Sequence, residues 1–122
     1  DAICATKAAI KQGIVPGGGI ALLNASSIIK PKTKGQKVLL EAIKSPFKTI
    51  LKNANIKEPD FNKNDGTGLN VVTGKMVNMV ESGIIDPLLV TKSALINAAS
   101  VATTILSTDC VINNMRIDES AR

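Results

Sequence analysis

The chain has 122 residues, enough for one modest domain that buries about two thirds of the surface its unfolded form would expose. It contains no histidine and only two cysteines, which excludes a histidine-based zinc site and a catalytic cysteine–histidine pair. We expect Cys4 and Cys110 to be small buried apolar residues in a reducing compartment. No segment is typical of a signal peptide or is expected to span a membrane, so the protein is expected not to be secreted.

The formal net charge is +5, and most of the excess lies between Lys30 and Lys63. A basic surface can attract nucleic acid. Here, however, the lysines alternate with aliphatic residues at helical spacing, no arginine cluster is present, and no aromatic platform exists on which bases could stack. We therefore expect a solvated helix face and no nucleic-acid partner. The alternative is a small basic helical module that binds nucleic acid or a helical protein.

A helix is predicted over residues 2–12, with Gly13 as its C-terminal cap. The run of three glycines at residues 17–19 then separates it from a second helical segment. A glycine run of this kind is typical of a tight turn or hinge. Alternatively, its bare amides at the start of a helix could bind the oxygens of a phosphate.

The second helix is predicted over residues 20–29, and we expect it to be buried because apolar side chains cover most of its faces. A short helix follows over residues 38–43. Ser45 is expected to cap a fourth helix over residues 46–54, since Pro46 suits the first helical position. Residues 55–68 are polar and rich in glycine and asparagine, which indicates a surface loop.

A short hairpin is predicted from Leu69–Val72, through Thr73 and Gly74, to residues 75–77 because of its β-branched residues and central glycine. Asp86 and Pro87 repeat the cap-and-proline signal and should open a long helix that ends near Ser107. We expect that helix to be central to the packing, through an apolar stripe of Val90, Ala94, Ala98, Val101 and Ile105. Residues 110–112 are predicted to form a terminal edge strand, and residues 113–122 a disordered tail.

Three motifs in the same order resemble the group I chaperonins, the GroEL-like family. They are the segment 1–10, the glycines 17–19, and Gly83-Ile84-Ile85-Asp86-Pro87 followed by the small-residue helix at residues 93–102. The resemblance implies that residues 1–122 are the C-terminal part of an equatorial ATP-binding domain, and so a fragment of a larger subunit. The implied fold is mainly α: a helical bundle segment with a small β-hairpin and a C-terminal edge strand.

The resemblance also implies roles for particular residues. Asp1 matches the carboxylate that orders or activates the water attacking the terminal phosphate of ATP, although an aspartate here could instead stabilise the helix dipole. Gly17 and Gly18 match the loop beside the nucleotide. Asp86 matches the acceptor for the ribose hydroxyls, a role compatible with capping the next helix.

The remaining implied contacts involve the base. Asn70, Val71 and Val72 match the hairpin that frames adenine, and Ile84 would pack on it. The family commonly has an aromatic residue where Leu69 stands and alanines at positions 71 and 72, so the valine methyl groups would narrow the pocket. A divergent chaperonin with weakened nucleotide use is therefore a further alternative.

The implied cofactors are ATP and Mg²⁺, with the magnesium ligands in a part of the protein N-terminal to Asp1 and no metal ligand in this chain. The full-length protein would be an ATP hydrolase that helps other proteins to fold, whereas the fragment alone should be inactive. Its partners would be the other subunits of a homo-oligomeric ring, a co-chaperonin and unfolded proteins, with no membrane. Its location would be the bacterial cytoplasm, the mitochondrion or the plastid.

Overall fold

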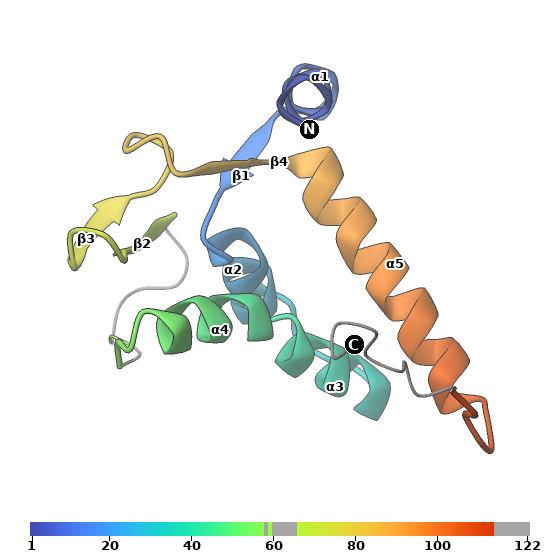
Figure 1. Ribbon diagram of the computed structural model, residues 1–122. Helices are drawn as coiled ribbons and strands as arrows, with labels where there is room; N and C mark the ends of the chain where they lie inside the picture. The colour runs from blue at the N-terminus through green and yellow to red at the C-terminus, as the bar shows by residue number, and fades with distance from the viewer. Residues whose placement is uncertain (58, 60–65, 114–122) are drawn as a thin grey trace, which may run out of the picture.

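The computed structural model describes residues 1–57, 59 and 66–113, which form a mainly α-helical structure with two small antiparallel sheets (Figure 1). The elements in chain order are α1 (Ala2–Gln12), β1 (Ile14–Pro16), α2 (Ile20–Ile28), α3 (Lys34–Ala42), α4 (Ser45–Asn53), β2 (Thr67–Asn70), β3 (Lys75–Asn78), β4 (Ile85–Pro87) and α5 (Leu88–Leu106). The predicted mainly helical fold and the predicted hairpin are thereby confirmed.

The first sheet joins segments far apart in the sequence, and the sequence analysis did not predict it. β1 pairs with β4, with Val15 opposite Asp86, and the amide of Leu88 donates a 3.1 Å hydrogen bond to the carbonyl of Gly13. Gly13 also caps α1 as predicted, its amide donating to the carbonyl of Ala9 at 2.7 Å. This pairing places α1 beside the N-terminal part of α5.

The second sheet is the predicted hairpin, with a shorter first strand than expected. β2 pairs with β3 from Thr67 opposite Asn78 to Asn70 opposite Lys75. Val71 and Val72 belong to the turn rather than to the strand. The hairpin therefore carries these two valines on a loop at its tip.

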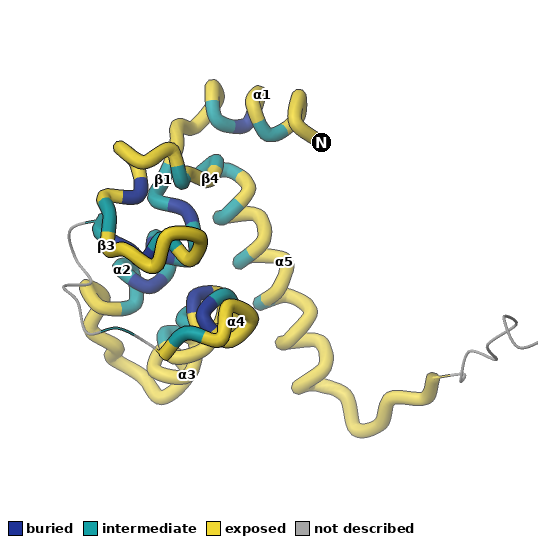
Figure 2. The backbone as a smooth tube through the Cα atoms, turned by 60° about the vertical axis from the view of Figure 1, so that its left-hand side comes forward, coloured by how far each residue is buried: buried dark blue, intermediate teal, exposed yellow. Residues whose placement is uncertain are grey.

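The core lies between α2, α4 and the hairpin, where Figure 2 shows the buried segments. Its largest side chains are almost completely buried: Ile20, Leu23, Phe47, Leu51, Leu69 and Met79. Burying one such side chain contributes roughly 1.5–3 kcal/mol, so this cluster fixes the hairpin against the helices. The prediction that α2 is buried holds for Ile20 and Leu23, whereas Ile28 at its end is exposed.

Two helix starts differ from the predictions, each for a local reason. α3 begins at Lys34 because Thr33 and Gln36 form a capping box: the side-chain oxygen of each accepts a hydrogen bond from the backbone amide of the other. The prediction that Ser45 caps α4 was wrong. Lys44 already has helical backbone angles and is the N-cap, so Ser45 lies inside the first turn and makes no capping bond.

Within the described residues, α5 is not central to the packing. None of its residues is buried. Leu88, Leu89, Thr91, Leu95 and Ala99 are half-buried, whereas Val90, Ala94 and Ala98 of the predicted stripe are exposed and line a groove between α5 and α2–α4. Contrary to expectation, α5 is long and apolar enough to cross a membrane by length and composition alone. Core helices of soluble proteins can have the same length and composition.

The C-terminal predictions fare differently. Residues 110–113 form no strand, so the predicted edge strand is absent from the part of the tail that the structure describes. Cys4 and Cys110 are free and exposed, which contradicts the expectation that both are buried. Residues 114–122, and most of the predicted polar loop before β2, lie outside the described residues.

Candidate nucleotide-binding site

The glycine run forms a tight turn between β1 and α2. The amide of Ile20 donates to the carbonyl of Gly17 at 3.1 Å, and Gly19 caps α2 in the left-handed conformation, with φ +78°. Gly17 is buried, and its amide donates to the carbonyl of Ile84 at 2.9 Å. A Cβ on Gly17 would lie 3.1 Å from the backbone of Ile84 and Ile85, so the turn needs glycine here to approach that segment.

The other two glycines allow close contact in different directions. A Cβ on Gly19 would lie 2.8 Å from the backbone nitrogen of Phe47, at the start of α4. A Cβ on Gly18, where φ is +65°, would lie 2.9 Å from the terminal methyl carbon of Met79. Each of the three glycines therefore lacks a side chain for a different reason, because a Cβ would meet a different neighbour at each position.

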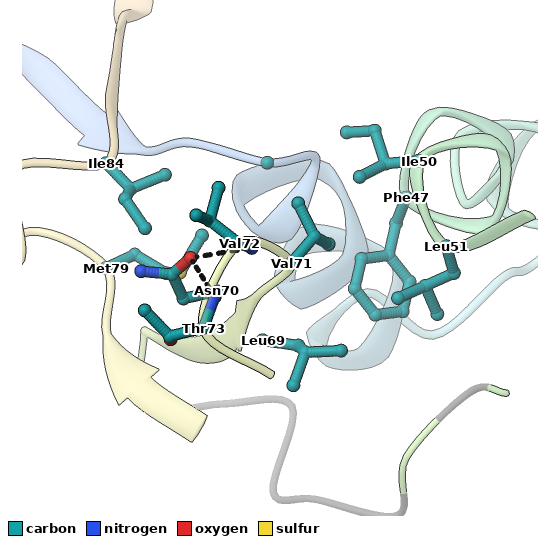
Figure 3. A pocket seen from close by; sticks show the side chains of 11 residues that line it. Phe47, Ile50, Leu51, Leu69, Asn70, Val71, Val72, Thr73, Met79 and Ile84 are labelled. Carbon is teal, nitrogen blue, oxygen red and sulfur yellow. Dashed lines mark hydrogen bonds between the residues drawn. The ribbon is translucent and has the colours of Figure 1, made fainter. Parts of the chain in front are cut away.

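An apolar pocket of about 410 Å³ lies between α4 and the hairpin (Figure 3). It is lined by Gly18, Phe47, Ile50, Leu51, Leu69, Asn70, Val71, Val72, Thr73, Met79 and Ile84. Its volume falls in the range of roughly 300–1,000 Å³ that is usual for small-molecule sites. No charged side chain of the described residues lines it, so the pocket suits a mostly apolar group.

The polar groups at this pocket belong to the hairpin tip. The side-chain oxygen Oδ1 of Asn70 accepts hydrogen bonds from the amides of Val72 at 3.0 Å and Thr73 at 3.3 Å, drawn as dashed lines in Figure 3. The carbonyl of Asn70 accepts a further bond from the amide of Gly74 at 2.8 Å. Asn70 thus closes the turn that carries Val71 and Val72.

A larger apolar groove of about 950 Å³ adjoins the pocket, between α5 and the group α2–α4. Gly18 and Ile50 line both cavities, so the bare backbone of Gly18 lies where the two meet. Asp86 lies on the groove side, in β4. Its predicted capping role was wrong: α5 begins at Leu88, its N-cap is Pro87, and no side chain caps it. No described side chain hydrogen-bonds or pairs with the Asp86 carboxylate, which leaves it available to a ligand.

Asp1 lies at the N-terminal end of α1 and lines neither cavity. It is exposed, and its side chain makes no capping hydrogen bond, although its carbonyl accepts a bond from the amide of Ala5 at 2.9 Å. Its carboxylate therefore has no structural task that the described residues reveal.

The strongest electrostatic interaction of the described residues lies away from these cavities. Hydrogen bonds from Lys44, at 2.6 Å, and from Lys48, at 3.0 Å, lower the pKa of Glu41 to about 2. All three side chains are at least partly exposed: Glu41 on α3, Lys48 on α4, and Lys44 at the N-cap between them. This is the solvated basic face that the lysine spacing predicts.

The family model of the TCP-1/cpn60 chaperonin family matches residues 1–116. The chain belongs to this family. It is similar to the mitochondrial chaperonin homolog Hsp-60 of Caenorhabditis elegans, with 38% identity over 133 aligned positions that cover 98% of this chain and 23% of that protein. Among solved structures, it resembles a group III chaperonin in the open state, with a TM-score of 0.68 and 29% identity over 86% of this chain and 25% of the other. This chaperonin chain thus spans about a quarter of the length of the relatives it matches.

The family recognised in the sequence is confirmed, and nothing supports the nucleic-acid alternative. Chaperonins are in general ATP-dependent, so a nucleotide is the ligand to test against the geometry. Five of the residues that the resemblance assigns to the nucleotide line the apolar pocket: Gly18, Asn70, Val71, Val72 and Ile84. Asp86 lines the adjoining groove. Gly17 packs against the backbone of Ile84 and Ile85, and Asp1 lines neither cavity.

The sequence analysis missed one wall of the pocket of this chaperonin chain. Phe47, Ile50 and Leu51 project from α4 into it, and Met79 closes it from the end of the hairpin. Phe47, Ile50 and Leu51 are spaced so that they share one face of the helix predicted over residues 46–54. Nothing in the sequence indicated that this face would meet the hairpin and the glycine turn.

Proposed function

We propose that this chain is the C-terminal part of the equatorial ATP-binding domain of a GroEL-like chaperonin subunit. In the full-length protein it would supply part of the site at which ATP is bound and hydrolysed to drive the folding of other proteins. One observation supports this most strongly. Residues from three separate segments, assigned to the nucleotide by resemblance alone, line one apolar pocket.

The residues fit the two chemically different ends of a nucleoside. The adenine ring would lie in the apolar pocket, between the α4 wall and the hairpin tip, against Ile84. The ribose would cross the bare backbone of Gly18, where pocket and groove meet. Its hydroxyls would donate to the Asp86 carboxylate, a charge-assisted hydrogen bond for which none of the described side chains competes.

The phosphates require groups that this chain does not provide alone. The described residues contain no group of three or more acidic, cysteine or histidine side chains that could hold a metal ion. As the family resemblance implies, Mg²⁺ would be held by a part of the subunit outside this chain, where it would neutralise phosphate charge. Asp1 would order the attacking water, and its freedom from any capping bond is compatible with that role.

The exposed surface of α5 supports the proposal that the chain is one piece of a larger domain. Val90, Val101 and Ile105 share one side of α5 and are each about half or more exposed, and exposed apolar surface of this kind marks contact surfaces. Since the chain spans about a quarter of its relatives' length, the rest of the subunit is the natural cover for this face. The isolated chain should accordingly bind ATP poorly and hydrolyse none.

The full-length protein would assemble into a homo-oligomeric ring that works with a co-chaperonin on unfolded proteins. The mitochondrial relative favours an organellar location, with the bacterial cytoplasm as the alternative. The test is to isolate the native polypeptide with an antibody against this chain and to measure its size and its assembly with and without ATP. A large, ATP-responsive ring that hydrolyses ATP supports the proposal, whereas a free polypeptide of 122 residues would refute it.

A further inference from the structure

The turn at the tip of the β2–β3 hairpin is a protruding lip on the apolar pocket. Val71 and Val72 line the pocket, yet they are 36% and 91% exposed and belong to neither strand. Packing therefore does little to hold Val72 in place. The hydrogen bonds of the turn must fix the position of this lip.

Those hydrogen bonds converge on one residue. The Oδ1 of Asn70 accepts from the amides of Val72 and Thr73, and its carbonyl accepts from Gly74, which has a φ of +68°. An amide oxygen has two lone pairs, and both are used by these two backbone donors. Oδ1 is therefore engaged inside the protein and is not free to accept a hydrogen bond from a base.

We propose that Asn70 is a positioning residue: its side-chain oxygen holds the lip of residues 71–73 over the pocket, and the base is selected by its fit against Val71 and Val72. This inference rests on the proposed function. It adds that the hairpin tip selects the base of the nucleotide. It predicts that the acceptor oxygen of residue 70 matters and that its amide NH₂ group does not.

The same hairpin supplies a matched control. The Oδ1 of Asn78 accepts from the amides of Val80 at 3.1 Å and Glu81 at 3.3 Å, and its carbonyl accepts from Ser82 at 3.0 Å. This turn repeats the geometry of Asn70 at the opposite end of the hairpin, but Val80, Glu81 and Ser82 do not line the pocket.

N78A is a suitable control because Met79, the pocket residue next to Asn78, is held by backbone hydrogen bonds that do not involve the Asn78 side chain. The amide of Met79 donates to Gly66 at 3.2 Å, and its carbonyl accepts from Ile84 at 2.8 Å. Removing the Asn78 side chain should therefore disturb a turn of the same kind and leave the pocket wall in place.

The experiment measures ATP affinity in the full-length assembled protein for wild type, N70A and N78A, and amide exchange for these and N70D. N70A removes the acceptor and should weaken ATP binding about tenfold, as expected for losing a cap-like hydrogen-bond acceptor. N70D keeps an oxygen for both amides but replaces the NH₂ group with a negatively charged oxygen, so its effect is measured on the turn by amide exchange and not by ATP affinity. N78A should bind within about twofold of wild type. Amide hydrogen exchange at Val72 and Thr73 should accelerate in N70A and recover in N70D.

Each result decides the question. Unchanged ATP affinity in N70A would overturn the inference, and so would exchange of the Val72 and Thr73 amides that is as fast in N70D as in N70A. If N78A loses as much ATP affinity as N70A, the loss reflects general destabilisation of the hairpin, and the inference is overturned too. A wild-type protein that does not bind ATP would instead overturn the proposed function, and the role of the lip in base selection with it.

Discussion

Replacing Gly19 by alanine should be among the most damaging single-methyl changes in this chain. A left-handed backbone costs a non-glycine residue roughly 1–2 kcal/mol, and φ at Gly19 is +78°. The new Cβ would also lie 2.8 Å from the nitrogen and 3.0 Å from the Cα of Phe47. Because these are backbone atoms of α4, no side-chain rotation can relieve the clash, and such overpacking costs roughly 1–3 kcal/mol more. The expected total is about 2–5 kcal/mol.

Gly83→Ala is the matched control. Its φ is +72°, but a Cβ there would meet nothing within 4 Å, so only the backbone cost of roughly 1–2 kcal/mol remains. Native-state hydrogen exchange of the α4 amides in the full-length protein measures the difference. Exchange should be roughly 5- to 150-fold faster in Gly19→Ala than in Gly83→Ala, from an extra cost of about 1–3 kcal/mol. Equal exchange in the two variants would refute the contact between the glycine turn and α4.

Three further predictions concern charged side chains. Asp86→Ala should weaken ATP binding by about tenfold, measured by titration calorimetry, because the ribose would lose a charge-assisted acceptor; unchanged affinity would remove Asp86 from the site. In the full-length protein, Asp1→Ala should keep the affinity for ATP and lose most of the ATP turnover. Normal turnover in this variant would refute a catalytic role for Asp1. Glu41 should titrate near pH 2 by NMR. Because its folded pKa is lowered from 4.5, the stability that it contributes is present above about 4.5 and is lost as the pH falls toward 2; a midpoint near 4.5 would show that Lys44 and Lys48 do not pair with it.

The elements that were predicted well are those with a local signal. Gly13 ends α1 because a residue with φ +85° is needed there, and the β-branched residues with a central glycine identify the hairpin. The β1–β4 pair was missed because each strand has only three residues and its partner is about seventy residues away. No periodicity can appear in so short a segment.

Tertiary context also explains the errors at the helices. Asp86 and Pro87 look like a cap followed by the first residue of a helix, but pairing with Val15 and Ile14 holds both in extended backbone. The apolar stripe chosen on α5 was only partly right: Val90, Ala94 and Ala98 line the groove toward α2–α4, whereas Val101 and Ile105 do not. At the candidate site, the family resemblance assigned Gly18, Asn70 and Ile84 to the same ligand. The wall supplied by α4 was not predicted, because it depends on contacts between segments far apart in the sequence.

The glycine run forms the tight turn that was one of its two interpretations, and its geometry is compatible with the other, a ligand site. Packing alone accounts for Gly17, which approaches the backbone of Ile84, and for Gly19, which approaches that of Phe47. Gly18 lies between them and faces Met79, the pocket and the groove, so a side chain there would push Met79 or fill the junction of the two cavities. Gly17 and Gly19 thus allow the segment before β4 and the start of α4 to approach the turn closely. Gly18 leaves the junction between the pocket and the groove open.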